Sequence, residues 1–427
     1  MIKAVIMAGG KGTRISEICA DIPKPMIKIG DKPILEHEIL CLKDQGFIDI
    51  LITVSHLGEK IIDYFQDGSR FGVNIEYFFE KEPLGNAGAL FEIKDKLTDD
   101  FLLLNADSLF NIDFNRFITY HKEKGGLATL FTHPNSHPYD SGLIFADSNG
   151  AVLKWLNKED ERPKWYKNRV NAGLHILSKK LLEKRPDTPK VDLDRQILKP
   201  LAGSGKMFCY DSPEYVKDMG TPDRFYKVCD DYKKGLTSAR NLLNKQKAIF
   251  LDRDGTINKY VGFLRNIDDF ELIDGVANAI KKINDSGYLA IVVSNQPVIA
   301  RGEVTFDELN MIHNKLETVL GQSGAYLDAI YFCPHHPDKG FEGERKEFKI
   351  DCDCRKPKPG MLLKAASEFN IDLSKSFMIG DDKNDVLAGL AAGCTTIIVG
   401  EKAHNPEVNA DLRFKNLEDA INGILNK

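Results

Sequence analysis

An apolar run that ends in two aspartates constrains the fold of this chain more than any other feature. Residues 249–258 read Ile-Phe-Leu-Asp-Arg-Asp-Gly-Thr-Ile-Asn, a strand-like run followed by two acidic residues at spacing i, i+2. Residues at this spacing on a strand point the same way, so Asp252 and Asp254 face one small volume at the carboxyl end, where open α/β sheets place ligands. Two carboxylates at such a short distance repel each other unless a cation lies between them. For these residues alone, a strand followed by an ordinary Asp-Gly turn remains the alternative.

Three further motifs follow in the same half of the chain. An apolar run ends in Ser294-Asn295, Arg355-Lys356-Pro357 supplies positive charge, and Met378-Ile379-Gly380-Asp381-Asp382 precedes Asp385. In this order, the four motifs resemble those of the haloacid-dehalogenase-type (HAD) phosphatases. The resemblance implies a domain with a parallel sheet and a phosphatase site at its carboxyl edge.

The resemblance also implies a role for each motif residue. Asp252 attacks the phosphomonoester as nucleophile, and Asp254 is the general acid and base. Mg²⁺ is held by Asp252, the backbone carbonyl of Asp254, and Asp381, while Asp385 orients Lys356 or the metal-bound water. The residues expected to bind substrate are Ser294, Asn295, Arg301, Arg355 and Lys356.

The length of 427 residues is too great for one ordinary core, so two domains are expected. We expect one domain over residues 1–235, a linker over 236–246 and a second domain over 247–427. Both halves alternate short apolar runs with amphipathic segments, a pattern typical of βαβ units and mostly parallel sheets.

Composition excludes several classes of function. The formal net charge of −5 indicates no general attraction to nucleic acid or to an acidic membrane. No apolar run approaches the roughly 20 residues that span a bilayer, and the apolar stretch at the start is too short for a signal peptide. A bacterial-type cytoplasm is therefore expected. The oligomeric state is not predicted by these features.

The amino-terminal half begins with a glycine-rich turn after an apolar strand. Residues 9–14 read Gly-Gly-Lys-Gly-Thr-Arg, and glycines let backbone N–H groups close around a phosphate. Ile15 excludes a dinucleotide fingerprint, and the Walker spacing is absent. Lys24 follows between two prolines, in a stiff segment that presents one cation.

These two motifs together resemble the signature of the sugar-1-phosphate nucleotidyltransferases. The resemblance continues in the segments at 82–90, 101–107, 171–173 and 215–222. It implies a Rossmann-like domain of the GT-A type with a mixed sheet. Within that family, this half most resembles the mannose-1-phosphate guanylyltransferase-like branch, which includes the heptose-1-phosphate guanylyltransferases. Two positions depart from the family pattern: Ala106 stands where glycine is usual, and Asn-Lys-Glu around Lys158 replaces Glu-Lys-Pro.

In that family, the oxygen of a sugar 1-phosphate attacks the α-phosphorus of a nucleoside triphosphate and pyrophosphate leaves. Such chemistry depends on positioning and on cations. Asp107 and Asp218 are therefore expected to hold Mg²⁺, while Arg14 and Lys24 offset phosphate charge. The residues expected to contact the nucleotide or the sugar are Gly9, Gly10, Gly12, Thr13, Glu82, Gly85, Asn105, Lys158, Asn171 and Gly173.

Three of the 8 cysteines cluster beside histidine, at Cys333-Pro334-His335-His336 and Cys352-Asp353-Cys354. Three thiolates and one imidazole make a closed tetrahedral zinc site, for which we choose His335 with His336 in reserve. A disulfide is the alternative, and a reducing cytoplasm disfavours it. A closed site has no free position for catalysis, so the zinc would be structural and would position Arg355 and Lys356.

The zinc segment, Asn295-Gln296 and Ile299-Ala300-Arg301-Gly302 resemble the heptose-bisphosphate phosphatases, whose nearest relatives are the histidinol-phosphate phosphatases. Pro297-Val298 departs from the usual Ser-Gly. The two resemblances together imply a bifunctional enzyme that makes a nucleotide-activated heptose, with GTP as the expected triphosphate. One alternative joins a hexose-1-phosphate guanylyl- or uridylyltransferase to a histidinol-phosphate-type phosphatase. Another is a sugar-nucleotide sensor with one inactive half, which the intact acidic and basic motif residues of both halves disfavour.

Overall fold

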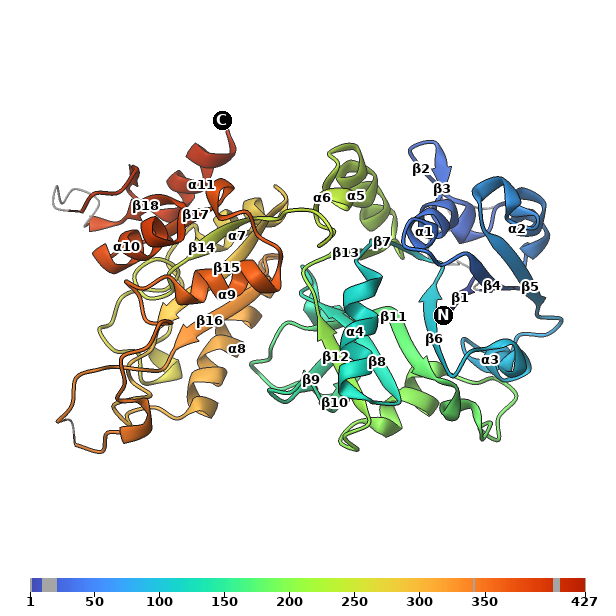
Figure 1. The fold of residues 1–427 in the computed structure, drawn as a ribbon, viewed down its shortest axis with the longest axis horizontal. Coiled ribbons are helices and arrows are strands. Elements are labelled where there is room, and N and C mark those ends of the chain that lie inside the picture. Colours follow the sequence, from blue (N-terminus) through green and yellow to red (C-terminus); the bar gives the residue numbers. More distant parts are fainter. Residues whose placement is uncertain (1, 10–20, 341, 402–407, 427) are drawn as a thin grey trace. The chain divides into compact units, whose positions relative to one another are not determined.

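The computed structural model describes residues 2–9, 21–340, 342–401 and 408–426. The chain divides into two compact units, and in Figure 1 most of the first is coloured from blue to green and most of the second from yellow to red. Unit 1 comprises Met1–His133, Gly142–Glu159 and Arg169–Asn241, and unit 2 comprises Pro134–Ser141, Asp160–Asn168 and Leu242–Lys427. In the described residues, no helix has both the length and the apolar character needed to cross a membrane.

Unit 1 is built on a mixed sheet, as the sequence predicts. In the described part of the chain this sheet has nine strands, ordered β10-β9-β11-β6-β1-β4-β5, with β8 paired to β11 and β12 paired to β8. Strands β6, β1, β4 and β5 run parallel, whereas β11 runs antiparallel to both β6 and β8. The strands are β1 (Lys3–Met7), β4 (Asp49–Val54), β5 (Asn74–Phe79), β6 (Asp100–Asn105), β8 (Ala128–His133), β9 (Leu143–Ala146), β10 (Val152–Leu156), β11 (Val170–Ser178) and β12 (Met207–Asp211).

Short strands and helices complete unit 1. Strands β7 (Ser108–Asn111) and β13 (Tyr215–Asp218) form an antiparallel pair, and so do β2 (Lys28–Ile29) and β3 (Lys32–Pro33). Asp113 caps the helix that follows β7, because its side chain accepts from the backbone N–H groups of Asn115 and Arg116. The helices are α1 (Ile34–Lys43), α2 (Gly58–Phe65), α3 (Gly88–Glu92), α4 (Phe114–Lys124), α5 (Pro222–Lys233) and α6 (Leu236–Ala239).

Unit 2 is built on a sheet whose strands are all parallel, which confirms the second predicted architecture. Its order among the described residues is β16-β15-β14-β17-β18-β19, so the strand with the two aspartates lies in the middle. The strands are β14 (Lys247–Leu251), β15 (Tyr288–Asn295), β16 (Ala329–Cys333), β17 (Phe377–Gly380), β18 (Thr395–Val399) and β19 (Leu412–Phe414). The helices are α7 (Val276–Asn284), α8 (Phe306–Gln322), α9 (Gly360–Glu368), α10 (Lys383–Ala392) and α11 (Leu417–Leu425).

Alternation along β14 explains why this sheet is buried on both faces. Ile249 and Leu251 belong to one apolar cluster, while Ala248 and Phe250 belong to another, and all four are fully buried. Successive strand residues point to opposite faces, so a continuous apolar run requires a cover on each side. Burial of both faces leaves the carboxyl ends of the strands as the place for polar side chains.

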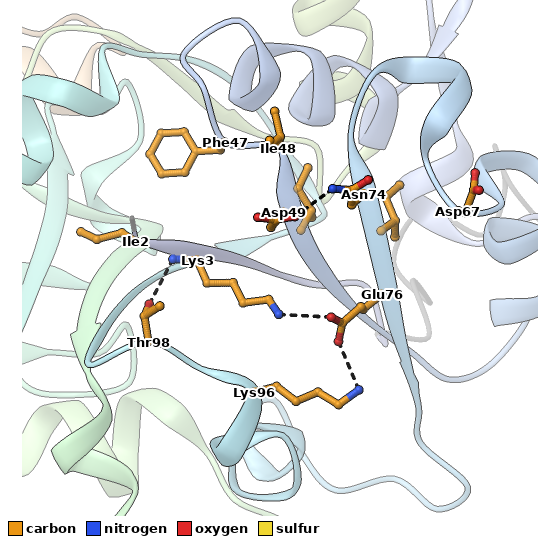
Figure 2. Close-up of a pocket in the computed structure, with 12 residues that line it drawn as sticks. Ile2, Lys3, Phe47, Ile48, Asp49, Asp67, Asn74, Glu76, Lys96 and Thr98 are labelled. Atoms are coloured by element: carbon orange, nitrogen blue, oxygen red, sulfur yellow. Dashed lines mark hydrogen bonds and ion pairs between the residues drawn. The ribbon is translucent and has the colours of Figure 1, made fainter.

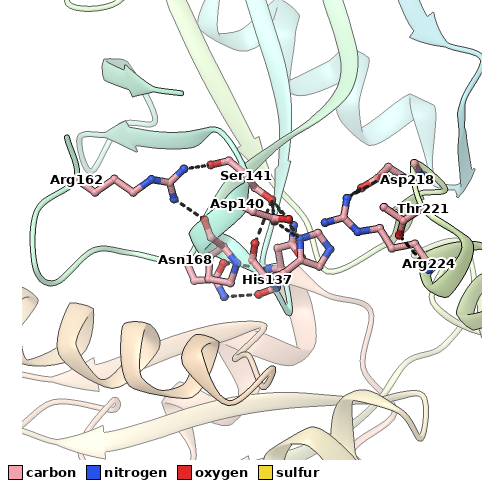
Figure 3. A network of polar contacts seen from close by, with 11 residues as sticks. His137, Asp140, Ser141, Arg162, Asn168, Asp218, Thr221 and Arg224 are labelled. Atoms are coloured by element: carbon pink, nitrogen blue, oxygen red, sulfur yellow. Dashed lines mark hydrogen bonds and ion pairs between the residues drawn. The ribbon is translucent and has the colours of Figure 1, made fainter. Parts of the chain in front are cut away.

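Unit 2 also takes in two segments from earlier in the chain. Arg162 donates to the backbone carbonyls of Pro138 (2.6 Å) and Ser141 (2.5 Å), as Figure 3 shows. The backbone N–H of Tyr166 donates to the Thr318 hydroxyl on α8 at 2.9 Å, and both groups are buried. These bonds hold residues 134–141 and 160–168 together on the helix.

Candidate functional site

In unit 2, the motif residues meet at the carboxyl ends of three neighbouring strands. Asp252 follows β14, Asp381 follows β17, and Ser294 lies near the end of β15. Because β14 pairs in parallel with both of the other strands, their carboxyl ends lie side by side. One oxygen from each of Asp252, Asp381 and Asp385 lies within 4.8 Å of the others. This arrangement fits a divalent cation, whose preferred ligands are carboxylate oxygens.

A buried lysine bridges two of these acidic residues. The Lys356 Nζ atom lies 2.6 Å from Asp252 Oδ1 and 2.6 Å from Asp385 Oδ1. Burial raises the pKa of Asp252 to about 7, with Lys356 opposing that shift and Asp385 and Asp254 adding to it. Burial by itself lowers the pKa of Lys356, but the two carboxylates outweigh it and the net direction is upward. Lys356 is therefore charged and supplies the positive charge that the sequence motif indicated.

Asp254 is held by a set of side-chain donors. Asn258 donates to its Oδ1 at 3.0 Å, Gln296 donates to its Oδ2 at 2.9 Å, and Arg253 donates to both oxygens. Burial by itself raises the pKa of Asp254, but the charge of Arg253 and these donors outweigh it, so the net shift is downward. Asp254 is thus ionised in the resting site.

Two features of the local backbone make this crowding possible. Gly255 has a positive φ of +87°, and a Cβ atom there would lie 2.5 Å from Asp381 Oδ2. Only glycine satisfies both conditions, which explains the glycine after the second aspartate. The Asn295 amide bonds to the Lys356 backbone at both ends, at 2.9 Å and 3.0 Å, and so holds the lysine in place.

The predicted cysteine and histidine residues also come together. The sulfur atoms of Cys333, Cys352 and Cys354 lie 3.1 to 3.5 Å apart, and His335 Nδ1 lies 3.3 Å from Cys354 Sγ. A disulfide requires about 2.05 Å between sulfurs, so these thiols are free. Burial raises the pKa of the Cys333 thiol, because the charged thiolate is poorly solvated there. Neighbouring thiolates at this place would therefore require a cation between them. His336 instead faces Asp338.

Arg301 lies outside the acidic cluster and contacts an aromatic ring. Its guanidinium carbon is 4.0 Å from the ring centroid of Phe263, on the loop after the nucleophile motif. Arg355 donates to the backbone carbonyl of His335 at 3.2 Å, so it joins the cysteine segment to Lys356.

In unit 1, the two predicted metal aspartates are neighbours. Asp218 at the end of β13 pairs in register with Ser108, the residue after Asp107. Lys24 Nζ lies 3.0 Å from Asp107 Oδ2. Figure 3 shows the second pair, in which Arg224 Nη1 lies 3.0 Å from Asp218 Oδ2. Each carboxylate therefore already has a cationic partner, and a bound metal would compete with both.

Other predicted residues lie at the same edge of the sheet. Gly173 has a φ of +77°, and a Cβ atom there would lie 2.7 Å from Asn105 Nδ2, so β11 approaches β6 closely at this point. The Asn171 side chain bonds to the Gly173 N–H at 3.3 Å and lies 3.2 Å from His175 Nε2. Glu82 and Lys158 are exposed, and Gly85 is half-buried. Gly10, Gly12, Thr13 and Arg14 lie outside the described residues.

A pocket of about 570 Å³ lies elsewhere in unit 1 (Figure 2). It is lined by residues at the amino ends of β1, β4 and β5, whereas the motif residues follow the carboxyl ends of β1 and β6. Glu76 pairs with Lys3 at 3.5 Å and Lys96 at 3.2 Å, and Asn74 donates to Asp49 at 3.0 Å. The two lysines of this pocket therefore pair with Glu76.

Sequence reasoning missed three residues that shape the Asp254 site: Arg253, Gln296 and His313. Arg253 stands inside the first motif, which is the signal that could have found it. Gln296 follows the second motif directly and donates to both Ser294 Oγ (2.8 Å) and Asp254. Nothing in the sequence near His313 points to the site.

Comparison with known proteins agrees with this division of motifs. Residues 3–235 match the nucleotidyl transferase family, and residues 353–420 match the HAD-hydrolase-like family. The chain is 27% identical to HddC from Yersinia pseudotuberculosis, a solved structure, over 54% of this chain and 100% of that one, with a TM-score of 0.48.

The carboxyl-terminal half has close curated relatives, each a D-glycero-β-D-manno-heptose-1,7-bisphosphate 7-phosphatase. The chain is 42% identical to the protein from Photorhabdus laumondii, over 42% of this chain and 96% of the relative. It is 42% identical to the protein from Escherichia coli, over 42% of this chain and 93% of the relative. It is 45% identical to the protein from Yersinia pestis, over 36% of this chain and 79% of the relative. The chain therefore belongs to the nucleotidyl transferase family through its amino-terminal half and to the family of these heptose-bisphosphate phosphatases through its carboxyl-terminal half.

Proposed function

We propose that this chain is a bifunctional enzyme of nucleotide-heptose synthesis. Unit 2 removes the 7-phosphate from a heptose 1,7-bisphosphate, and unit 1 transfers a nucleotidyl group, GMP from GTP, to the heptose 1-phosphate that remains. The observation that carries the proposal is the Asp252–Lys356–Asp385 cluster beside Asp381, in a half that covers 96% of a heptose-bisphosphate phosphatase. The two activities fit, because the product of the first is the substrate of the second.

In the phosphatase reaction, Asp252 attacks the phosphorus of the 7-phosphate and the bond to the sugar oxygen breaks. Asp254, which is ionised in the resting site, first takes the proton of the monoanionic phosphomonoester and then gives it to that oxygen as it leaves. Asp254 then takes a proton from water, which attacks the aspartyl-phosphate and releases inorganic phosphate with Asp252 restored. Mg²⁺ held by Asp252, the backbone carbonyl of Asp254, and Asp381 would supply positive charge to the phosphoryl oxygens. Lys356 and Ser294 would bind those oxygens too.

In the transferase reaction, Asp107 and Asp218 would hold Mg²⁺ at the carboxyl edge of the mixed sheet. Lys24, which pairs with Asp107 at 3.0 Å, would then be free to bind phosphate. Asn105, Asn171 and Gly173 adjoin this position and would contact the nucleotide and sugar. The charge on Arg14 would offset that of the triphosphate.

We also propose that Cys333, His335, Cys352 and Cys354 hold a structural zinc ion. Their donor atoms all lie within 4.8 Å of one another, with the three sulfurs 3.1 to 3.5 Å apart, and suit a tetrahedral ion with bonds of about 2.0 to 2.3 Å. All four positions are then filled by protein. The ion would tie the segment before Arg355 and Lys356 to the end of β16.

The proposal is tested by giving the purified chain both anomers of heptose 1,7-bisphosphate and following the position of phosphate loss by ³¹P NMR. Loss of the 7-phosphate with retention of the 1-phosphate is expected. A second assay offers heptose and hexose 1-phosphates with each nucleoside triphosphate in turn. Pyrophosphate release with GTP and heptose 1-phosphate is expected. Loss of the 1-phosphate first would contradict the heptose assignment, and product with UTP alone would correct the base.

A further inference from the structure

Arg253 lies between the two aspartates of the nucleophile motif and is fully buried. Its Nε donates to Asp254 Oδ1 at 3.1 Å, and its Nη2 donates to Oδ1 at 3.0 Å and to Oδ2 at 2.8 Å. A buried guanidinium is tolerated only when it is paired, and this two-atom grip fixes the plane of the carboxylate as well as its charge. One edge of Arg253 therefore sets how Asp254 points.

The other edge of Arg253 contacts a histidine on α8. Arg253 Nη1 lies 3.2 Å from His313 Nε2, and the two residues are 60 positions apart in the sequence. A guanidinium only donates hydrogen bonds, so Nε2 must be the acceptor and the His313 proton lies on Nδ1. His313 is buried, and its ring lies 5.5 Å from that of Phe332. Burial, with the charge of Arg253 adding to it, lowers the pKa of His313 to about 3, which keeps the ring neutral.

We propose that His313 is a positioning residue of the phosphatase: it fixes the guanidinium of Arg253 and, through it, the carboxylate of Asp254 in the orientation needed for proton transfer. This inference rests on the proposed role of Asp254 as acid and base. Asn258 and Gln296 each contribute one bond to Asp254 and neither contacts both of its oxygens. The grip that defines the carboxylate plane thus comes from Arg253, which His313 holds at its far side.

Loss of the His313 acceptor would leave Nη1 of a buried cation without that partner. The guanidinium would then turn toward other acceptors, and Asp254 would turn with it. Proton transfer requires the donor within hydrogen-bond reach of the sugar oxygen, so a displacement of less than about 1 Å is enough to slow it. Attack by Asp252 depends on different contacts and would be affected little.

This difference gives a test based on the leaving group. A sugar alkoxide leaves with difficulty and needs the proton from Asp254, whereas p-nitrophenolate is a weak base and leaves without it. The comparison uses kcat/KM, which reports the step that breaks the P–O bond, for heptose bisphosphate and for p-nitrophenyl phosphate. The variants are H313F, which has no acceptor, and H313Q, whose amide oxygen can accept from Arg253. The control is I312V, which trims a neighbouring buried side chain of α8.

We expect H313F to lower kcat/KM about 30-fold for the sugar phosphate and less than about threefold for the aryl phosphate. H313Q should restore most of the loss, and I312V should change both substrates equally and little. If H313F does not fold, H313M takes its place as a flexible residue of similar size. Equal loss on both substrates, or a defect in H313Q as large as that of the apolar variant, would overturn the inference. A wild-type protein without sugar-phosphatase activity would instead refute the proposed function itself.

Discussion

At the scale of single residues, the balance of buried charge explains the phosphatase site. Lys356 pairs with two buried acidic groups, Asp252 and Asp385, so the cluster has one basic group for two acidic groups before Asp381 is counted. Buried charges are costly unless they are paired. A divalent cation bound by these acidic groups would favour their ionised forms and would neutralise the charge that Lys356 leaves unpaired.

The substitution Lys356→Met removes the compensating charge and leaves the two carboxylates facing each other. We expect phosphatase activity to fall at least about 100-fold, and the free energy of unfolding of unit 2 to fall by about 3 kcal/mol. Inorganic phosphate release and denaturant unfolding measure the two effects. The matched control is Lys358→Met, because Lys358 lies two residues away and pairs with Asp351 at an exposed site. Equal effects of the two substitutions would contradict the assigned role of Lys356.

His175 on β11 should make the stability of unit 1 depend on pH. Burial lowers its pKa to about 3, whereas an unfolded histidine titrates near about 6.5. Between these values only the unfolded chain binds the proton, so stability is complete above pH 6.5 and is lost as the pH falls toward 3. The loss approaches about 1.4 kcal/mol per pH unit.

The variant His175→Gln tests this dependence, because it removes the titrating ring and keeps a polar side chain. Unfolding midpoints at pH 7.5 and 5.0 are compared for wild type and variant, and contributions from other groups cancel in the difference. We expect the midpoint of the variant to fall less over this interval. Parallel losses in the two proteins would show that His175 is not responsible.

At the scale of elements, the segment between β16 and α9 contains the cysteine cluster. The cluster joins Cys333 at the end of β16 to Cys352 and Cys354, and Arg355 and Lys356 follow at once. Helix α9 begins soon after them at Gly360. The segment carries few apolar residues of its own, so an ion at the cluster would replace the missing core.

We expect about one zinc ion per chain by elemental analysis, and nearly none in Cys354→Ser. The variant should also lose thermal stability in unit 2 and phosphatase activity, because Lys356 follows the cluster directly. Cys394→Ser is the control, since Cys394 is a buried free thiol of the same unit that lies outside the cluster. Zinc-free wild-type protein with all its thiols reactive would refute the prediction.

The strand-end residues of the phosphatase site could be predicted from sequence, whereas the contacts that orient them could not. An apolar run ends at each of Asp252, Asp381 and Ser294. Parallel strands bring such ends together at one edge of the sheet, and this does not depend on how the helices pack against it. The contact of Asn295 could not be predicted in this way, because its side-chain amide bonds to the backbone of Lys356, a residue distant in the sequence. That contact, like the one between Arg253 and His313, depends on how distant segments pack, and local patterns carry no information on it.

The same distinction holds in unit 1. The ends of β6 and β13 placed Asp107 and Asp218 as acidic neighbours, as their motifs indicate. The pairing of Lys24 with Asp107 was not expected, since Lys24 was assigned to phosphate. An ion pair of this kind depends on whether a phosphate or metal is present, and sequence motifs describe the loaded site.

At the scale of the whole molecule, the described motif residues proposed for each reaction lie within one unit. Asp252, Asp381 and Lys356 lie in unit 2, while Lys24, Asp107 and Asp218 lie in unit 1. Neither described set borrows a motif residue from the other unit. The two activities should therefore be lost independently.

The substitution Asp252→Asn should abolish phosphate release and leave nucleotidyl transfer to heptose 1-phosphate near the wild-type rate. Asp107→Asn should do the reverse, because it changes only the proposed metal site of unit 1. Each variant is assayed for both half-reactions, with circular dichroism to confirm folding. Equal loss of both activities in either folded variant would contradict independent sites.

Complementation between these variants tests the central claim most directly. Heptose 1,7-bisphosphate and GTP are incubated with Asp252→Asn alone, with Asp107→Asn alone, and with both variants mixed, and products are measured by mass spectrometry. We expect no GDP-heptose with Asp252→Asn alone, heptose 1-phosphate with Asp107→Asn alone, and GDP-heptose with the mixture, because the intermediate diffuses between chains. A mixture that consumes the bisphosphate without forming any nucleotide-heptose would contradict the account.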